Sequence, residues 1–414
     1  MFQIPSPPRR KSWMAISASM AILLISPSYA EDFTLMVTNP DPLGLGDFVP
    51  SDADLDLGIE GKFKGDLSYG IGIYSVYNSN FFQTEDNEES ELTTSLVPWL
   101  HYISDPEGGA MISVVANYSP SWNTYLENSD LNAFDQAGNI TLSFSGGKSH
   151  LDVFAHYVEI SGTDRLTGAF VQGTIMTAGL RATRQIASRT SLNAGWSYSI
   201  SEYGSGDYEG AEVYTTYFGG LWQATPRISL GPTLRYTISE SDNTGTCDAW
   251  ALLFEARYHV GERLWLSASI GPEYTKNSND TNNDSGLGLT GNLTARYVIN
   301  ERWTWTNSLR SATVPAPDET NYLVYNVAFN TALHRQLRSG SFGFGLQYDF
   351  SEYKDVGDVS SDVGNENYTS LFVNYQRPLY KDRVSFNTEV RYTFNEGQED
   401  WSQWQVSAGL DVSF

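Results

Sequence analysis

The chain has 414 residues, of which 18% are charged and 14% aromatic, and its formal net charge at pH 7 is −24. A disordered chain would be poor in aromatic residues, and a nucleic-acid-binding protein needs a basic surface to neutralise phosphates, so both classes are excluded. The single cysteine, Cys247, excludes an intramolecular disulfide and a cysteine-based zinc site. These values favour an exported protein rich in β-structure.

Residues 1–30 have the pattern of a cleaved secretory signal peptide. Three basic residues at 9–11 precede an apolar stretch at 13–25, and small residues stand at the −3 and −1 positions of a cleavage site after Ala30. The alternative is an N-terminal membrane anchor, but the apolar stretch is shorter than the about 20 residues that a spanning helix needs. The next segment, 31–65, contains several prolines and glycines, and we expect it to be a periplasmic linker or a small plug.

From residue 66 onward, the chain repeats segments of about a dozen residues in which apolar and small polar residues alternate. In 192–200, the even positions are Leu, Ala, Trp, Tyr and Ile, and the odd positions are Asn, Gly and Ser. Because side chains alternate between the two faces of a strand, each segment predicts a strand with one apolar and one polar face. A soluble β-sandwich also alternates, but its strands average roughly five or six residues. The length of these segments therefore favours membrane-spanning strands.

The segments predict an all-β fold, a transmembrane antiparallel up-and-down β-barrel over residues 66–414. We expect about 18 strands, with 16 as the alternative. An even number of strands places both termini of the barrel on the periplasmic side. Short periplasmic turns alternate with long acidic external loops, and an arginine recurs beside the turns at positions 189, 227, 263, 302 and 338. The strands are expected near 66–78, 91–103, 110–119, 134–146, 149–160, 173–186, 190–203, 211–224, 227–240, 248–260, 263–275, 286–299, 302–313, 321–335, 340–351, 367–377, 382–395 and 401–414.

The long connections hold most of the acidic residues. The first of them, 79–91, contains Glu85, Asp86, Glu88, Glu89 and Glu91. An acidic rim of this kind would attract cations and repel anions at low salt. The alternative is that the surface loops are simply acidic, with divalent ions bridging them to lipopolysaccharide. Since no connection is longer than about 16 residues, we expect no loop to fold inward as a constriction.

Aromatic residues on the apolar faces gather near the strand ends, as expected where a barrel crosses two membrane interfaces. This aromatic girdle comprises Tyr258, Tyr297, Trp303 and Trp305 near the turns, and Tyr198, Tyr236, Tyr274 and Tyr392 toward the loops. The last strand alternates and ends in Phe414. Such an ending looks like the assembly signal of bacterial outer-membrane barrels, which makes the barrel-assembly machinery an expected partner.

The polar faces are expected to line an aqueous lumen, because a barrel of 16–18 strands is too wide for side chains to fill. Opposite charges on this wall would set up a transverse field that tunes ion passage, or would pair and stiffen the wall; both explanations stay open. Aromatic residues along the inside would be expected for a polysaccharide route; Trp222 and Trp265 have inward parity, but two positions are too few to argue from. The charged residues with inward parity are Arg181, Arg235, Arg257, Arg296, Arg310, Arg391, Glu255, Glu273 and Glu389.

No catalytic, metal or cofactor site is expected. The five histidines are dispersed, and the sequence has no HExxH, P-loop or dinucleotide-binding motif. His150 and His156 share one face of a strand, which we interpret as coincidence.

The first hairpin resembles the opening of the β-barrel porin type 2 family. Residues 74–82 read Tyr-Ser-Val-Tyr-Asn-Ser-Asn-Phe-Phe, an acidic stretch follows at 88–91, and the next strand has a central Pro98. The resemblance implies a large bacterial outer-membrane barrel that passes solutes or a sugar polymer, since members are often linked to exopolysaccharide export. It implies no catalytic residues.

We therefore expect a porin-like channel of the bacterial outer membrane, which passes ions and small solutes or serves as an exopolysaccharide export conduit. The alternative is a non-conducting structural or adhesive barrel. Expected partners are outer-membrane lipid, lipopolysaccharide and the transported solute or polysaccharide, with no nucleic acid.

Overall fold

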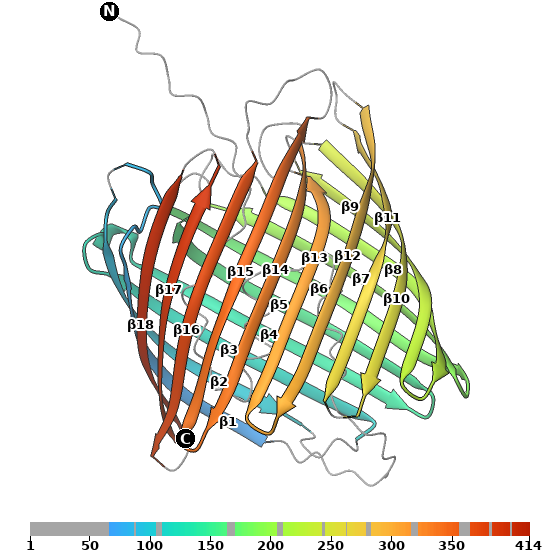
Figure 1. The fold of residues 1–414 in the computed structure, drawn as a ribbon, viewed down its shortest axis with the longest axis horizontal. Coiled ribbons are helices and arrows are strands. Elements are labelled where there is room, and N and C mark those ends of the chain that lie inside the picture. Colours follow the sequence, from blue (N-terminus) through green and yellow to red (C-terminus); the bar gives the residue numbers. More distant parts are fainter. Residues whose placement is uncertain are drawn as a thin grey trace, which may run out of the picture.

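A computed structural model describes residues 66–86, 88–104, 110–163, 170–204, 210–241, 245–261, 263–278, 283–315, 322–355, 365–380, 383–397 and 400–414. The expected signal peptide and the segment 31–65 lie outside these residues. The described residues form one antiparallel sheet of 18 strands that closes on itself as a barrel (Figure 1). Its strands are β1 (Asp66–Asn78), β2 (Glu91–Ile103), β3 (Ile112–Tyr125), β4 (Ala133–Gly146), β5 (Ser149–Thr163), β6 (Phe170–Ala187), β7 (Thr190–Tyr203), β8 (Ala211–Thr225), β9 (Ile228–Ser241), β10 (Gly245–Val260), β11 (Leu264–Ser278), β12 (Asn283–Asn300), β13 (Trp303–Pro315), β14 (Tyr322–Leu337), β15 (Gly340–Asp355), β16 (Glu366–Tyr380), β17 (Val384–Glu396) and β18 (Trp401–Ser413).

Each strand pairs with its neighbours in the sequence, and β1 closes the barrel by pairing with both β2 and β18. At this seam Tyr74 lies opposite Gly409 on one side and Ser95 on the other. The predicted fold class is thus confirmed, with 18 strands rather than 16. The end where β1 begins and β18 ends is here called the turn end, and the other is called the loop end (Figure 1). Apart from the β2–β3 connection at 104–111, the connections at the turn end are shorter than most of those at the loop end.

Large apolar side chains cover one face of the sheet, and many of them are exposed. On three adjacent strands, Leu234, Leu252 and Ile270 are all more than half exposed. In a soluble protein, a continuous apolar surface of this extent would be covered by a partner. No helix among the described residues is long and apolar enough to cross a membrane.

The third strand is longer than the sequence predicted. It was expected to end at residue 119 but continues to Tyr125, so most of the expected loop 120–133 belongs to β3, to a short 3-10 turn (Ser129–Leu131) and to β4. Pairing between β2 and β3 lapses between Leu96 and Leu100, where Pro98 lies opposite Pro120. Since proline has no N–H to donate, two facing prolines leave a gap in the ladder. Pro120 therefore interrupts the hydrogen bonds without ending the strand.

Candidate functional site: the inner face of the barrel

The polar faces of the strands lie on the inner, concave side of the wall. Nη2 of Arg235 on β9 donates to Glu273 Oε2 on β11 at 2.7 Å and to Thr290 Oγ1 on β12 at 3.1 Å. Side chains from strands that are not neighbours converge on the concave side of a curved sheet and diverge on the convex side. Leu234 and Tyr274, which alternate with these residues, are 51% and 46% exposed. The convex side is therefore apolar and the concave side polar.

The charged residues with inward parity all occupy this inner face. In the strand registers Arg235 lies opposite Ala251, which lies opposite Glu273, and the other members align with inner-face residues in the same way. Their effect on a passing solute stays a prediction. The set is Arg181, Arg235, Arg257, Arg296, Arg310, Arg391, Glu255, Glu273 and Glu389.

Arg235 and Glu273 form a fully enclosed ion pair. Each side chain is 4% exposed, and Ala251 between them is 1% exposed. The Thr290 hydroxyl accepts from Arg235 and donates to the carbonyl oxygen of Ser311 at 3.1 Å. Glu273 Oε1 is buried without a hydrogen-bond partner, so the carboxylate depends on the arginine for its stabilisation. The pair ties β9, β11 and β12 together.

Arg391 is held on the opposite part of the wall by three contacts. Its Nη2 lies 2.9 Å from Glu389 Oε1, and its Nη1 donates to Ser370 Oγ at 3.3 Å. The guanidinium also stacks 5.1 Å from the ring centroid of Phe372. That ring occupies the space above Gly345, where an added Cβ would lie 2.5 Å from it. An inner-face glycine here provides room for an aromatic ring and does not widen the lumen.

Arg257, Arg181 and Arg296 have looser contacts. Arg257 Nη2 lies 3.5 Å from Glu255 Oε2, with side chains 27% and 13% exposed. Two more stack on aromatic rings: Arg181 lies 4.6 Å from the Phe154 centroid, and Arg296 lies 5.4 Å from Trp265. Arg310 lies opposite Ala328 on the neighbouring strand. Ion pairing on the inner wall, one of the two explanations left open by the sequence, therefore applies to Arg235, Arg257 and Arg391.

The two signs of charge occupy different parts of the described inner wall. The strands β6–β13 carry mainly arginines, whereas β14–β18 and β1–β5 carry mainly carboxylates. Two opposed arcs of this kind are the arrangement that the transverse-field explanation requires. The arginine arc contains Arg181, Arg235, Arg257, Arg296 and Arg310 with Glu255 and Glu273; the carboxylate arc contains Glu91, Asp135, Asp152, Asp349, Glu366, Glu389 and Asp411 with Arg391.

The first loop differs from the expected acidic rim in one residue. Glu85, Asp86, Glu88 and Glu89 are exposed as expected, but Glu91 is 1% exposed. Its carboxylate accepts hydrogen bonds from the backbone N–H groups of residues 126, 127 and 128 and from the Asn128 side chain, at 2.7–3.1 Å. Residues 126–128 follow the end of β3, so Glu91 fixes a neighbouring connection and does not belong to the exposed rim.

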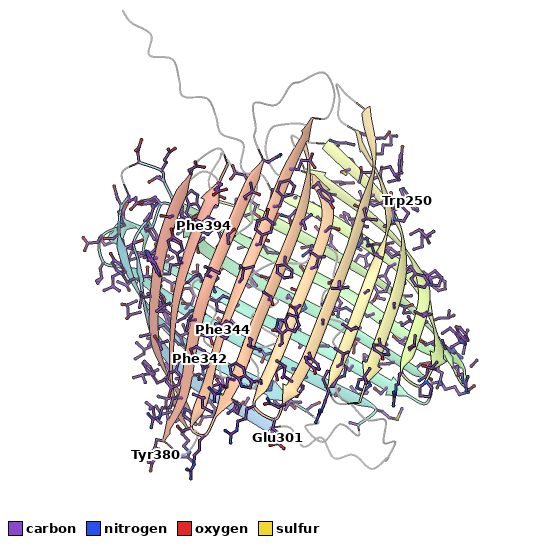
Figure 2. All side chains as sticks on the ribbon, in the orientation of Figure 1. Trp250, Glu301, Phe342, Phe344, Tyr380 and Phe394 are labelled. Carbon is purple, nitrogen blue, oxygen red and sulfur yellow. The ribbon has the colours of Figure 1, made fainter. Side chains whose placement is uncertain are left out.

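The aromatic girdle residues lie on the outer face toward the two ends. Tyr236 stacks on Trp250 at 3.9 Å between centroids and donates to Asp248 Oδ1 at 2.5 Å. At the turn end, Trp305 Nε1 donates to Thr331 Oγ1 at 2.9 Å. Figure 2 shows Trp250 toward the loop end, and Glu301 and Tyr380 at the turn end. Tyr198, Tyr236, Tyr258, Tyr274, Tyr297, Trp303, Trp305 and Tyr392 all alternate with inner-face residues.

Trp222 was expected to face inward, and this expectation was wrong. It lies opposite Leu230 and Thr190, on the same face as Phe218, and is 54% exposed. Trp265 does face inward, and its ring stacks on His259 at 5.2 Å. The C-terminal Phe414 stacks on Tyr69 at 5.8 Å, and its backbone N–H donates to the Tyr69 carbonyl oxygen at 2.9 Å.

The structure brings together three residues that the sequence did not connect. Ser145 Oγ lies 3.0 Å from His150 Nδ1, and His150 Nε2 lies 2.9 Å from Asp152 Oδ1. The residue types are those of a hydrolytic triad, but the serine faces Nδ1 and the carboxylate faces Nε2, the reverse of the usual arrangement. The histidine side chain is 48% exposed, and Asp152 also accepts from Ser143 at 2.6 Å. We interpret the group as a cross-strand polar network.

Among the described residues, no group of three or more His, Cys, Asp or Glu side chains is arranged to hold a metal ion. Cys247 is buried on the inner face between Ser239 and Asn277.

No family model matches the chain, and neither does any curated protein sequence. The resemblance to the β-barrel porin type 2 family therefore stays a prediction. Solved structures similar to this fold include Pseudomonas aeruginosa OccK2 (OpdF), with 11% identity and a TM-score of 0.46 over 84% of this chain and 98% of that one. Acinetobacter baumannii OccAB4 gives the same four values. The ferric citrate transporter FecA has 11% identity and a TM-score of 0.43 over 81% of this chain and 60% of its own. Likeness at this level does not bear on function.

Proposed function

We propose that this protein is a porin-like channel of the bacterial outer membrane, which gives ions and small solutes passive passage. The observation that carries the proposal is the separation of the two faces of a closed 18-stranded wall. Charged and polar side chains converge on the concave side, and large apolar side chains cover the convex side. A closed sheet with these two faces can enclose a water-filled lumen in lipid, because its strands pair with one another around the whole barrel and leave no open edge.

The same features support the expected partners. The outer apolar face would contact outer-membrane lipid, and the exposed carboxylates of the first loop would meet lipopolysaccharide through divalent ions. The C-terminal aromatic residue would serve the barrel-assembly machinery. We favour small solutes over an exopolysaccharide as the transported substrate, because a binding track for sugars needs exposed aromatic faces. Trp222 points outward, and the inner-face rings of Tyr74 and Phe154 are 4% and 7% exposed. The half-buried inner-face rings of Tyr217, Trp265 and Phe372 lie on β8, β11 and β16, which are not neighbouring strands.

The direct test is single-channel conductance in a planar bilayer, with the mature chain and with a chain that lacks residues 31–65. Cation-preferring steps from both chains would support an open channel with an acidic mouth. Steps that appear only after truncation would support the plug hypothesis for 31–65. If both chains fold and neither conducts, the channel is refuted and the structural or adhesive barrel takes its place.

A further inference from the structure

The first loop contains a segment that folds into the mouth of the barrel, although its length led us to expect no inward loop. Residues 79–84, here called the first-loop arm, follow β1 at the loop end. Asn80, Phe81 and Gln83 are 0%, 3% and 5% exposed, whereas Glu85 and Glu89 in the rest of the loop are exposed. A connection that simply extended into solvent would expose both halves equally.

The contacts of Phe81 show where the arm lies. Its ring centroid is 5.5 Å from that of Tyr125 at the end of β3 and 6.2 Å from that of Phe170 at the start of β6. These two rings also meet edge to face, 5.5 Å apart. Tyr125 has the parity of the inner-face residues Ser121 and Asn123. Since β4 and β5 separate β3 from β6, one ring from the first hairpin contacts both strands only from inside the mouth.

The arm is fixed at its base by hydrogen bonds to β18. The Ser79 backbone N–H donates to the Trp404 carbonyl oxygen at 2.9 Å, and the Trp404 N–H donates to Ser79 Oγ at 2.8 Å. Gln403 Nε2 donates to the Asn80 carbonyl oxygen at 2.5 Å. Asn80 Nδ2 in turn donates to the carbonyl oxygens of Ser402 and Thr84, at 3.2 and 2.8 Å.

The arm is also closed within itself. The Thr84 N–H donates to Asn80 Oδ1 at 3.2 Å, and the Phe81 N–H donates to the Glu89 carbonyl oxygen at 2.7 Å. Gln83 adopts a left-handed backbone with φ of 53°. A non-glycine residue takes this conformation at a cost, which the surrounding hydrogen bonds offset. The arm therefore holds one conformation rather than moving as an open loop.

Tyr125, which the Phe81 ring contacts, is also held in place. The Tyr125 N–H donates to Asn132 Oδ1 at 2.8 Å, and the turn that follows Tyr125 is held by the buried carboxylate of Glu91. The aromatic ring of Phe81 thus rests between two fixed partners.

We propose that the first-loop arm is the permanent constriction of the channel at the loop end, and that Phe81 is the anchor that sets the largest solute able to pass. The inference rests on the proposed channel function. It extends that function by assigning the size limit to one hairpin, seated from the β18 seam to β6. Removal of the Phe81 ring would detach the arm from Tyr125 and Phe170 and enlarge the mouth, whereas the hydrogen bonds at Asn80 would keep its base in place.

The test uses the full mature chain, with conductance in planar bilayers and swelling of proteoliposomes in a graded series of neutral oligosaccharides. The variant Phe81→Ala is compared with Phe134→Ala, which removes an equal ring from the outer face of β4, where it is 45% exposed. Phe81→Leu is the second variant, because it keeps an apolar anchor if alanine prevents folding. A difference in gel migration between unheated and heated samples confirms that each variant is folded.

We expect Phe81→Ala to raise the conductance and to shift the size limit to a longer oligosaccharide, Phe81→Leu to give a smaller shift in the same direction, and Phe134→Ala to match the wild type. A wild type that conducts, with a size limit unchanged in both folded Phe81 variants, would overturn the constriction and leave the channel standing. A folded wild type that passes neither ions nor sugars would overturn the channel, and the constriction with it.

Discussion

The buried pair of Arg235 and Glu273 gives the sharpest energetic prediction. Replacement of one partner leaves the other charge enclosed, because both side chains are 4% exposed. Breaking a buried pair in this way costs about 3–5 kcal/mol, whereas replacing both partners by apolar residues of similar volume is nearly neutral. We therefore expect Arg235→Met and Glu273→Leu each to lower the free energy of unfolding by about 3 kcal/mol, and the double variant to lose far less than their sum.

The same wall supplies a matched control. Arg257 and Glu255 are 3.5 Å apart and 27% and 13% exposed, so water screens them more strongly. The corresponding cycle with Arg257→Met and Glu255→Leu should give a coupling energy of only about 0.5–1 kcal/mol.

Urea unfolding of the four proteins of each cycle, followed by tryptophan fluorescence in the same lipid, measures both coupling energies. A coupling at Arg235 and Glu273 no larger than that at Arg257 and Glu255 would show that the enclosed pair is accessible to water. The argument that it ties β9, β11 and β12 together would then fail.

Three further predictions concern the seam, the loops and the rim. In Gly409→Ala the new Cβ would overlap the Tyr74 ring, whose hydroxyl donates to Asp411 Oδ1, so we expect the free energy of unfolding in urea to fall by about 1–3 kcal/mol. Gly286→Ala, with its nearest atom at 3.5 Å, should be neutral, and an equal effect of both changes would contradict this reasoning. Glu91→Gln weakens the hydrogen bonds to the backbone N–H groups of residues 126–128, so chymotrypsin should cleave faster after Leu126. An unchanged cleavage rate would show that the carboxylate does not hold this turn. Neutralising Glu85, Asp86, Glu88 and Glu89 should lower the preference of the channel for cations, measured by reversal potentials. The effect should be larger at 0.1 M than at 1 M salt, because the Debye length falls from about 10 to 3 Å between these concentrations. A cation preference that is independent of salt would place its origin inside the lumen.

The barrel itself was predictable because its main signal has a period of two residues. Alternation along 192–200 shows directly which side chains share a face, and the repeated pattern predicts an antiparallel barrel of about 18 strands, although it leaves 16 as an alternative. Where the contrast between faces fades, the prediction fails. The consecutive glycines Gly219 and Gly220 give no apolar or polar preference, and the orientation of Trp222 just after them was assigned to the wrong face.

The parts of the site that escaped prediction depend on partners far apart in the sequence. In the sequence Glu91 is one of several acidic loop residues, and only the structure shows that its carboxylate accepts hydrogen bonds from N–H groups 35–37 residues away. Phe81 contacts Tyr125 and Phe170 across strands that do not pair. Loop length did not reveal the inward arm, because an arm tied to β18 and β6 needs only a few residues to cross part of the mouth.

The inner face also shows why small residues are a poor measure of an open lumen. A Cβ on Gly179 would lie 2.6 Å from the Phe154 ring, and a Cβ on Gly345 would lie 2.5 Å from the Phe372 ring. In both places the glycine lets a large ring lie against the wall, and an arginine then stacks on that ring. The guanidinium is thereby held close to the wall, where it contributes charge with little obstruction. At these two positions the inner-face glycine therefore serves to place an arginine.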